Sequence, residues 1–190
     1  MIPRLKILIA GGGIGGLSAA LALHQRGHEV TIAEAARVVK PLGVGINLLP
    51  HAVAVLDRLG LLAALRSSGV ETELLIFANR FGQTIYRDPR GVGAGASHPQ
   101  ISIHRGEAHS ILWRAAQQRI GSARLLVDHR LVGFSGHGDR VAAQFQTSEG
   151  ATTIDADLLI AADGIHSAAR AQLFPDEGPP RWNGVMMWRG

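Results

Sequence analysis

Two groups of residues in this 190-residue chain have types and spacings that could do chemistry. The first is a glycine-rich turn that fits G-x-G-x-x-G through Gly11, Gly13 and Gly16, with Glu34 following 18 residues after the third glycine. Backbone N–H groups at such a turn, together with the positive end of a helix dipole, can bind a pyrophosphate. A carboxylate at the position of Glu34 can accept hydrogen bonds from both ribose hydroxyls, and it would repel a 2′-phosphate. This group therefore predicts an adenine dinucleotide site that disfavours NADP.

The second group lies in residues 157–170, where an apolar run leads directly into Asp163 and Gly164. Ligands in open α/β sheets bind at the carboxyl ends of the strands, so a strand over 157–161 would bring the Asp163 carboxylate to a binding edge. The same carboxylate could instead cap a helix that begins at Ile165. On the residues alone, both interpretations stay open.

Other arrangements that carry chemistry are missing from the sequence. None of the nine histidines stands in an H-x-x-x-H or comparable ligand spacing, and His104 and His109 are badly placed to share one metal, so we predict no metal site. Cysteine is absent, which excludes disulfides and thiolate ligands. No triad or carboxylate pair is visible, and we assign no catalytic residue.

The elements that must position the glycine turn surround it in the right order. Residues 5–10 form a nearly continuous apolar run, which is typical of a strand buried in a parallel sheet. The pattern then predicts a helix over 17–25, ended by Arg26 and Gly27, and a second strand over 28–33 that ends at Glu34. A glycine pattern is weak evidence by itself, but here strand, turn, helix, strand and acid follow one another as a dinucleotide-binding unit requires.

The rest of the chain continues as alternating helices and strands. The predicted elements up to residue 120 are a loop over 41–47, a helix over 50–60, a helical turn over 61–65, strands over 70–78 and 83–86, a loop over 87–99, a strand over 101–104 and a helix over 107–120. Beyond these, we expect a strand over 124–127 that extends the parallel sheet, antiparallel strands over 130–134, 140–146 and 152–154, a buried strand over 157–161, and a strand over 184–188.

Composition and charge limit the class of protein. The chain is 46% hydrophobic and only 18% charged, as in a packed globular protein. Its net charge of +4 and pI of about 10.6 come from scattered Lys and Arg, so we expect no nucleic-acid partner, and a basic surface would instead attract anionic ligands. The apolar run near the amino terminus is too short for a signal peptide or a membrane span, so we expect no membrane partner and a cytoplasmic location. The sequence carries no signal for an oligomeric state.

The second chemical group also carries a family resemblance. The motif D-h-h-h-G-x-D-G-x-x-S-x-h-R is matched by Asp157, Asp163, Gly164, Ser167 and Arg170, with Ala161 in place of its first glycine. Together with the amino-terminal unit, it makes the chain resemble the group A flavoprotein monooxygenases, the superfamily of para-hydroxybenzoate and salicylate hydroxylases. Within them the chain is more similar to the flavin-dependent phenazine hydroxylases, through segments 41–47, 89–92, 99–100, 103–107, 162–168 and 187–190.

This resemblance implies a fold and a domain organisation. The fold class would be α/β, a Rossmann-like FAD-binding domain whose parallel sheet carries a three-stranded antiparallel crossover, plus the start of a β-rich substrate domain. The FAD-binding domain would span residues 1–180, with 70–100 contributing strands on the substrate side. Residues 181–190 would be the truncated start of a substrate-domain strand.

The resemblance also implies the residues that bind the cofactor, FAD. The turn and helix start would bind the pyrophosphate, Glu34 with the adjoining Ala35 would bind the adenosine ribose, and Arg105 would reach the phosphate and ribityl region of the flavin. Gly45 would lie in the backbone near the isoalloxazine, and Asp163 with Gly164 belongs to the motif that the family uses for both FAD and NAD(P)H. The cofactor-binding residues so implied at the turn are Gly11, Gly13, Ile14, Gly15 and Gly16.

The activity that the resemblance implies is hydroxylation of a small aromatic substrate, of which a phenazine is one candidate. NADH or NADPH as co-substrate would reduce the flavin, and O₂ would add to give a C4a-hydroperoxide that hydroxylates the ring. The family's second flavin motif, Gly-Asp-Ala-Ala-His, is absent, so we expect the chain to be an amino-terminal portion that is inactive alone.

Two alternatives to the monooxygenase remain. An NAD-dependent Rossmann dehydrogenase would use the same βαβ unit, and a non-catalytic nucleotide-binding module would keep only the scaffold. A visible spectrum separates the three, because bound flavin absorbs blue light, NAD does not, and a bare scaffold is colourless.

Overall fold

The chain divides into two units in a computed structural model that describes residues 3–187. The first unit consists of Met1–Lys40 and Leu112–Gly190, and the second of Pro41–Ile111. The predicted boundary of a single FAD-binding domain at residue 180 stays a prediction.

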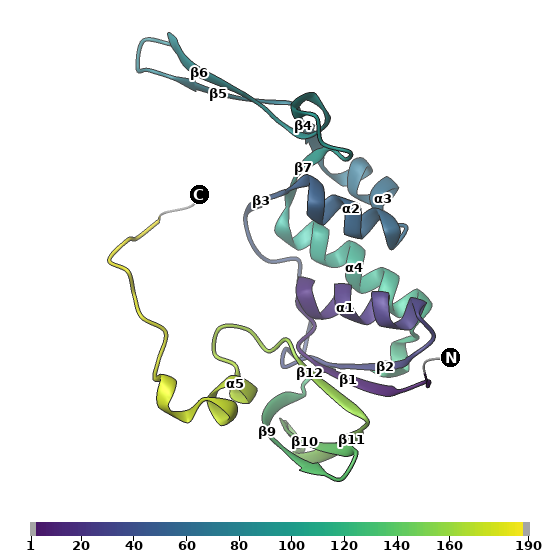
Figure 1. The fold of residues 1–190 in the computed structure, drawn as a ribbon. Helices are drawn as coiled ribbons and strands as arrows, with labels where there is room; N and C mark the ends of the chain where they lie inside the picture. Colours follow the sequence, from purple (N-terminus) through teal and green to yellow (C-terminus); the bar gives the residue numbers. More distant parts are fainter. Residues whose placement is uncertain (1–2, 188–190) are drawn as a thin grey trace. The chain divides into compact units, whose positions relative to one another are not determined.

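A four-stranded parallel sheet organises the first unit (Figure 1). Its strands stand in the order β12-β1-β2-β8, and each of the three pairings is parallel. Their bounds are Lys6–Ala10 for β1, Glu29–Ala33 for β2, Leu125–Leu126 for β8 and Leu158–Ala161 for β12. The predicted α/β class and the extension of the sheet by the strand near residue 125 are thus confirmed.

Helix α1, Ile14–Gln25, connects β1 to β2 and begins three residues earlier than the sequence predicted. Gly13 is the residue before its first turn, so the helix starts inside the glycine pattern. Its end is as predicted. Gly27 N–H donates to His24 O at 2.9 Å and His28 N–H to Leu23 O at 3.2 Å, the pair of bonds that satisfies the last carbonyls of a helix ending in glycine.

A three-stranded antiparallel sheet, in the order β11-β10-β9, packs on one face of the parallel sheet. The strands are β9, Arg130–His137, β10, Arg140–Thr147, and β11, Gly150–Ala156. They confirm the predicted antiparallel crossover and run longer than predicted. Helix α5, Ala168–Leu173, is fastened to β9 by Gln172, whose amide accepts from Phe134 N–H at 3.0 Å and donates to Phe134 O at 2.6 Å.

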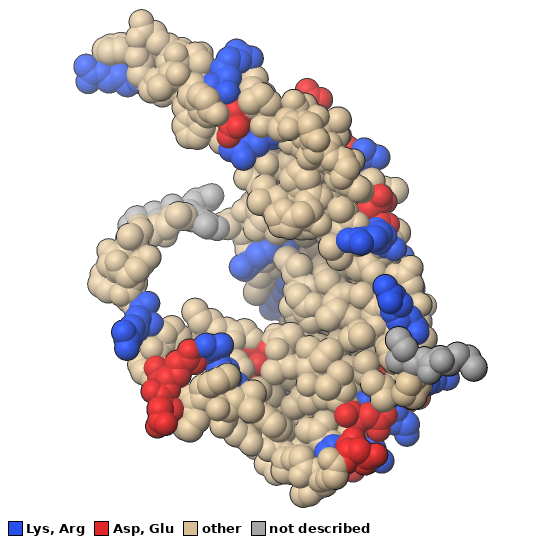
Figure 2. All heavy atoms as spheres, viewed as in Figure 1, with Lys and Arg blue, Asp and Glu red and all other residues tan. Residues whose placement is uncertain are grey.

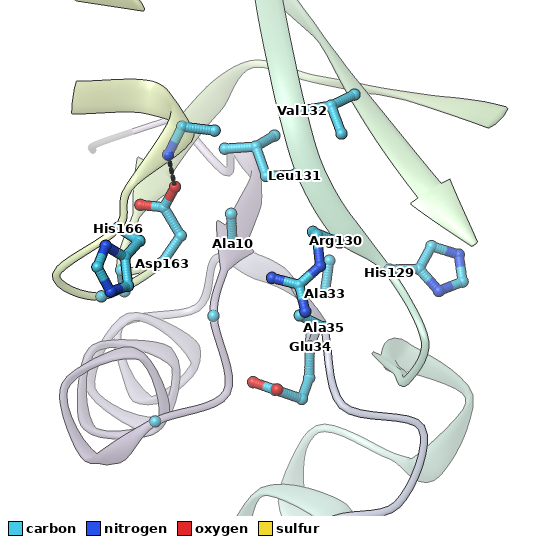
Figure 3. A pocket seen from close by; sticks show the side chains of 15 residues that line it. Ala10, Ala33, Glu34, Ala35, His129, Arg130, Leu131, Val132, Asp163 and His166 are labelled. Atoms are coloured by element: carbon cyan, nitrogen blue, oxygen red, sulfur yellow. Dashed lines mark hydrogen bonds between the residues drawn. The ribbon is translucent and has the colours of Figure 1, made fainter. Parts of the chain in front are cut away.

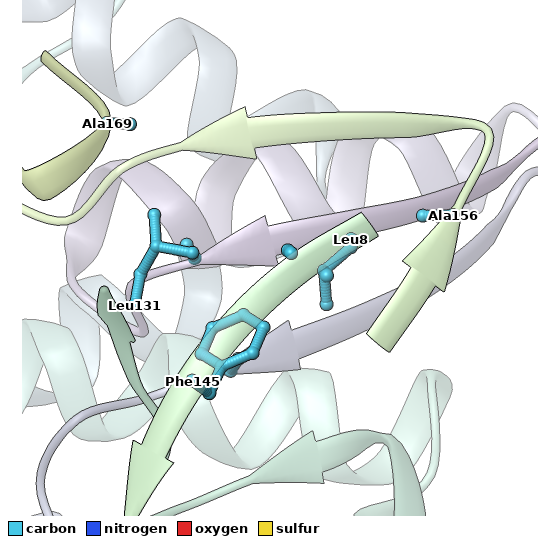
Figure 4. Packing of buried hydrophobic residues seen from close by; sticks show 8 residues of the cluster. Leu8, Leu131, Phe145, Ala156 and Ala169 are labelled. Carbon is cyan, nitrogen blue, oxygen red and sulfur yellow. The ribbon is translucent and has the colours of Figure 1, made fainter. Parts of the chain in front are cut away.

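The core of this unit lies between the two sheets. Alternation along β1 sends Leu8 and Ala10 toward the antiparallel sheet, where they meet Leu131 from β9 and Phe145 from β10 (Figure 4). Phe145 is fully buried. The residues of opposite parity, Ile7, Ile9, Val30 and Ile32, are buried on the other face of the sheet, against which α1 lies (Figure 1).

Strand β12 departs from the prediction of a buried strand. Leu158 is 42% exposed, and the other residues of β12 are half-buried or exposed. Within residues 3–187, β12 pairs only with β1 and therefore forms an edge of the sheet. An apolar run predicts contact with both faces of a sheet, but it cannot tell whether a neighbouring strand covers the edge.

The second unit contains an antiparallel sheet in the order β3-β7-β4 and a separate two-stranded sheet of β5 and β6 (Figure 1). The helix α4 begins here and continues into the first unit. The bounds are β3 Gly45–Leu48, α2 Pro50–Arg58, α3 Leu62–Ser68, β4 Val70–Thr72, β5 Leu74–Ala78, β6 Thr84–Pro89, β7 Gln100–His104 and α4 Arg105–Arg119. The described residues also contain three short 3-10 turns, Gly91–Ala94 in this unit and Ser122–Arg124 and Pro175–Glu177 in the first unit.

Three predictions for the second unit were wrong in detail. The predicted loop over 41–47 ends in β3, which pairs with β7 in the register Gly45↔His104. The prediction missed this strand because it has only four residues and two glycines lie at or just before its start. The predicted strand over 70–78 is two strands, β4 and β5, in different sheets. The predicted loop over 87–99 begins with the end of β6 and contains the turn Gly91–Ala94.

Surface charge and hydropathy add two findings. On the face shown in Figure 2, blue Lys and Arg are interspersed with red Asp and Glu and do not form one continuous basic patch. No helix within residues 3–187 combines the length and the apolar composition needed to cross a bilayer. Residues 181–187 carry no strand, and the rest of the predicted strand over 184–188 lies outside the described residues.

Candidate nucleotide-binding site

A cavity of about 550 Å³ opens at the carboxyl ends of the parallel strands (Figure 3). Four segments line it: the end of β1 with the turn after it, the end of β2 with the residues after it, His129 with the start of β9, and the loop from β12 to the start of α5. The lining residues are Ala10, Gly11, Gly13, Ala33, Glu34, Ala35, His129, Arg130, Leu131, Val132, Ala162, Asp163, Gly164, His166 and Ala168. Six of the predicted cofactor residues are among them, and the two sequence groups that suggested chemistry therefore meet at one site.

The glycine turn brings three backbone segments into close approach. Gly11 has a φ of +110°, and a Cβ there would lie 2.1 Å from Ala162 O. A Cβ on Gly16 would lie 1.9 Å from Gly11 O, so helix α1 packs directly on the turn. Both positions need glycine for the fold itself.

Gly13 differs from these two glycines. A Cβ built on it has no heavy atom within 4 Å, and no side chain caps the start of α1. The first N–H groups of the helix and the positive end of its dipole therefore face open space beside the cavity, as anion binding requires. The predicted residues Ile14, Gly15 and Gly16 lie in α1 behind this mouth and do not line the cavity.

The Glu34 carboxylate is held in place by backbone hydrogen bonds. Its Oε2 accepts from Gly12 N–H at 2.7 Å, and its Oε1 accepts from Ala36 N–H at 2.8 Å. A Cβ on Gly12 would lie 3.0 Å from both Glu34 Oε2 and the ring of Trp113, so the carboxylate also sits in a packed corner. Each carboxylate oxygen has a second lone pair, so Glu34 can still accept from a ligand hydroxyl.

Asp163 both lines the cavity and caps a helix, the two roles that its sequence position suggested. Its Oδ2 accepts from Ala168 N–H at 2.8 Å at the start of α5, which Ser167 also caps by accepting from Arg170 N–H at 2.9 Å. Its Oδ1 is buried and has no hydrogen-bond partner among the described residues. A buried acceptor without a donor is costly, so an unpaired oxygen in a cavity wall points to a ligand that supplies one.

The wall formed by residues 129–132 was not predicted. His129 N–H donates to Glu34 O at 2.8 Å. The His129 ring packs edge-on against the ring of the buried Phe145, with 6.0 Å between the ring centroids. The Arg130 side chain points over Ala33 and Ala35 (Figure 3). A signal was available, because the strand predicted near 125 must deliver the residues that follow it to the same carboxyl edge as Glu34.

Gly45 and Arg105 lie in the second unit. A Cβ on the neighbouring Gly43, whose φ is +131°, would lie 2.5 Å from Arg105 Nε, so the guanidinium rests on this glycine. Arg105 N–H donates to Val44 O at 2.9 Å, and His104 Nε2 lies 2.9 Å from Gly43 O. The structure thus joins residues 43–45 to Arg105, and their predicted contact with a flavin stays a prediction.

An ion pair fastens the end of α5. Arg170 donates to Glu177 through Nε, at 2.6 Å from Oε2, and through Nη2 to Oε1. These hydrogen bonds lower the pKa of the Glu177 carboxyl and raise the pKa of Arg170. Elsewhere in the unit, a hydrogen bond from Arg124 lowers the pKa of Glu29.

Within residues 3–187 no cluster of three His, Cys, Asp or Glu side chains is arranged to hold a metal ion.

Sequence comparison matches residues 4–183 to a family described as FAD binding domain. Among curated relatives, phenazine 1,6-dicarboxylic acid hydroxylase PhzS of Lysobacter antibioticus is 43% identical over 98% of this chain and 47% of its own length. The 3-hydroxybenzoate 6-hydroxylase 1 of Aquipseudomonas alcaligenes is 32% identical over 97% of this chain and 46% of its own length. The chain therefore spans about half the length of the curated relatives it matches.

Solved structures share the fold. The p-nitrophenol 4-monooxygenase PnpA from Pseudomonas putida superimposes with a TM-score of 0.79 at 21% identity, over 91% of this chain and 44% of that one. Klebsiella pneumoniae HpxO, solved in complex with FAD, superimposes with a TM-score of 0.73 at 26% identity, over 89% of this chain and 42% of that one.

Proposed function

The chain belongs to the family of FAD binding domains, and on this premise we propose that it is the FAD-binding part of an aromatic hydroxylase. The whole protein would use NADH or NADPH and O₂ to hydroxylate a phenazine-like aromatic substrate. One observation carries the proposal. Gly13 at the mouth of α1, Glu34 with its fixed carboxylate, and Asp163, whose buried Oδ1 has no hydrogen-bond partner within residues 3–187, all line a single cavity at the carboxyl edge of the sheet.

These three features fit the parts of FAD in order along the cavity. The N–H groups at the mouth of α1 would bind the pyrophosphate, because no side chain within residues 3–187 caps them and they lie at the positive end of the helix. The lone pairs left on Glu34 would accept the adenosine ribose hydroxyls. The Oδ1 of Asp163 would accept from a hydroxyl or amide donor, which removes the cost of an unsatisfied buried oxygen.

The work of the chain in this proposal is binding and orientation. Bound FAD would supply the electron transfer from NAD(P)H and the activation of O₂. In the second unit, Arg105 is held against Gly43 with its guanidinium exposed, and it would contribute positive charge toward the flavin phosphate and ribityl region. Because the cofactor would supply the chemistry, the reaction does not require a catalytic triad or a carboxylate pair, which the sequence lacks.

The substrate class rests on the relatives. Their names refer to hydroxylation of a phenazine dicarboxylic acid and of 3-hydroxybenzoate, both planar aromatic compounds. The higher identity to the phenazine enzyme supports a phenazine-like substrate.

Titration of the purified chain with FAD tests the cofactor role. We expect saturable binding of one FAD per chain, seen as quenching of flavin fluorescence and as blue-light absorption that stays with the protein after gel filtration. Glu34→Gln should weaken binding, because an amide NH₂ would face the N–H of Gly12 or Ala36 in place of an acceptor. The matched control is Glu149→Gln, a carboxylate in the turn after β10 that does not line the cavity.

Two other outcomes of the titration would contradict the proposal. Binding of NADH with no binding of FAD would favour a dehydrogenase, and a chain that binds neither would be only a scaffold. For the chemistry, the full-length protein should oxidise NAD(P)H in the presence of a phenazine carboxylate and release a hydroxylated product; NAD(P)H oxidation that yields no such product would rule out the phenazine assignment.

A further inference from the structure

The wall formed by residues 129–132 in the cavity follows directly after Asp128. Asp128 N–H donates to Ala36 O at 3.1 Å, and His129 N–H donates to Glu34 O at 2.8 Å. These two bonds join the residues that follow β8 to the residues that follow β2. The backbone that carries the wall is therefore joined to the backbone that carries the ribose-binding carboxylate.

Asp128 has an unusual backbone conformation. With a φ of 59°, it is the one residue other than glycine within 3–187 that has a positive φ. Non-glycine residues adopt this left-handed region at a cost, and aspartate and asparagine tolerate it best. The turn at Asp128 redirects the chain from the end of β8 into the wall, and it places the Arg130 side chain over the cavity (Figure 3).

The Asp128 carboxylate holds this conformation through two distant segments. Its Oδ2 accepts from Ser148 N–H at 2.9 Å and from the Ser148 hydroxyl, in the turn between β10 and β11. Its Oδ1 accepts from Arg37 Nε at 3.2 Å, in the loop after β2. These bonds, those from Ser148 above all, lower the pKa of Asp128. One side chain thus connects its own segment, which leads into the cavity wall, to the turn between β10 and β11 and to the loop after β2.

Resting on the proposed role in FAD binding, we propose that Asp128 is a positioning residue that preforms the adenosine end of the cavity. It fixes the 129–132 wall at a set distance from Glu34, so that the nucleotide enters a cavity that is already formed. The side chain of Arg130 on that wall makes no hydrogen bond or ion pair with the described part of the chain, so its guanidinium is available to lie against the adenine ring. Preorganisation of this kind raises affinity by lowering the ordering cost of binding.

The experiment compares Asp128→Gly with Asp128→Asn, using ADP and FAD as separate probes. Glycine keeps the left-handed backbone and loses every side-chain bond, whereas asparagine keeps the backbone and can still accept from Ser148. We expect Asp128→Gly to weaken ADP binding by about tenfold, which corresponds to about 1.4 kcal/mol, with faster dissociation. Asp128→Asn should recover part of this loss, and FAD should follow the same order.

A merely structural role is separated by measuring affinity well below the melting temperature of each variant, on protein shown to be folded by circular dichroism. The control is Glu29→Gln, which breaks the ion pair with Arg124 in the same unit and does not line the cavity. It should lower the melting temperature and leave the ADP affinity unchanged. If Asp128→Gly does not fold, Asp128→Asn and Ser148→Ala decide, and both should weaken ADP binding.

The failures are distinguishable. Folded Asp128 variants that bind ADP like the unaltered chain would overturn the positioning role while FAD binding by the unaltered chain stands. If the unaltered chain binds neither ADP nor FAD, the proposed function itself fails.

Discussion

Replacing Gly13 by alanine would test whether the mouth of α1 binds a pyrophosphate without disturbing the fold. A Cβ at this position has no heavy atom within 4 Å, and the backbone angles, φ −73° and ψ 178°, suit alanine. Alanine is a poorer residue than glycine before the first turn of a helix, a difference of about 1 kcal/mol or less. Gly13→Ala should therefore lower the melting temperature of the ligand-free chain by only a few degrees.

The effect on FAD should be much larger than the effect on stability. Gly13 lines the cavity, and the added methyl group would hold the pyrophosphate away from the N–H groups that it needs. A lost hydrogen bond to a charged group costs about 1.5–3 kcal/mol, which weakens binding roughly 10- to 100-fold. Titration calorimetry with FAD and with ADP measures this loss, and thermal unfolding of the ligand-free variant measures its stability.

Two other glycines provide the matched comparisons. Gly136 lies in β9, away from this cavity, with no heavy atom within 4 Å of an added Cβ, so Gly136→Ala should change neither property. Gly16→Ala should destabilise the fold, because an added Cβ has no room there. Its Cβ would lie 1.9 Å from Gly11 O, and ordinary contact begins at 3.4 Å, so helix and turn must separate by 3.4 − 1.9 = 1.5 Å. Overpacking of this kind costs about 1–3 kcal/mol.

The reasoning would be refuted by two results. A Gly13→Ala chain that binds FAD as tightly as the unaltered chain would show that no pyrophosphate lies at this turn. A Gly16→Ala chain with unchanged stability would show that helix and turn are not packed as closely as the distances state.

Truncation of the buried Phe145 to alanine should destabilise the first unit by about 3–5 kcal/mol, measured by urea unfolding, whereas leucine should retain most of the stability. Gly43→Ala should displace the Arg105 guanidinium, so we expect it and Arg105→Ala both to weaken FAD binding in a fluorescence titration; normal affinity in Gly43→Ala alone would contradict the close contact. Because the pKa of Glu177 is lowered in the folded chain, its ion pair with Arg170 stabilises above the unfolded-state pKa, and this contribution disappears as pH falls through the folded pKa. The stability difference between the unaltered chain and Glu177→Gln should therefore shrink below about pH 4 in acid unfolding curves, and a constant difference would argue against the pair.

Much of the site could be predicted because its signals are local. The close approach of Gly11 and Gly16, the presence of α1 and the position of Glu34 are properties of about thirty consecutive residues in one βαβ unit. Asp163 was also predicted at the binding edge, since a strand delivers the residue after it to its own carboxyl end. The two readings of Asp163 could not be separated, because they concern different oxygens of one carboxylate.

The predictions failed where an element takes its environment from distant segments. The four residues of β3 are too few to show a period, and they form a strand only because β7, more than fifty residues later, supplies the partner. Strand β12 has the apolar composition of a buried strand, but its exposure depends on whether another strand lies beside it. Local patterns carry no information about such partners.

The sequence by itself determined the class of fold, the glycine turn and the acid at the end of β2, since spacing along the chain fixes strand, turn and helix together. Only the tertiary structure decided what closes the cavity on the other side. Asp128, Ser148 and Arg37 are far apart in the chain, and nothing in their types marks them as neighbours. Their meeting depends on the antiparallel sheet packing over the parallel one, and this packing is set by buried area between whole sheets and not by any local pattern of residues.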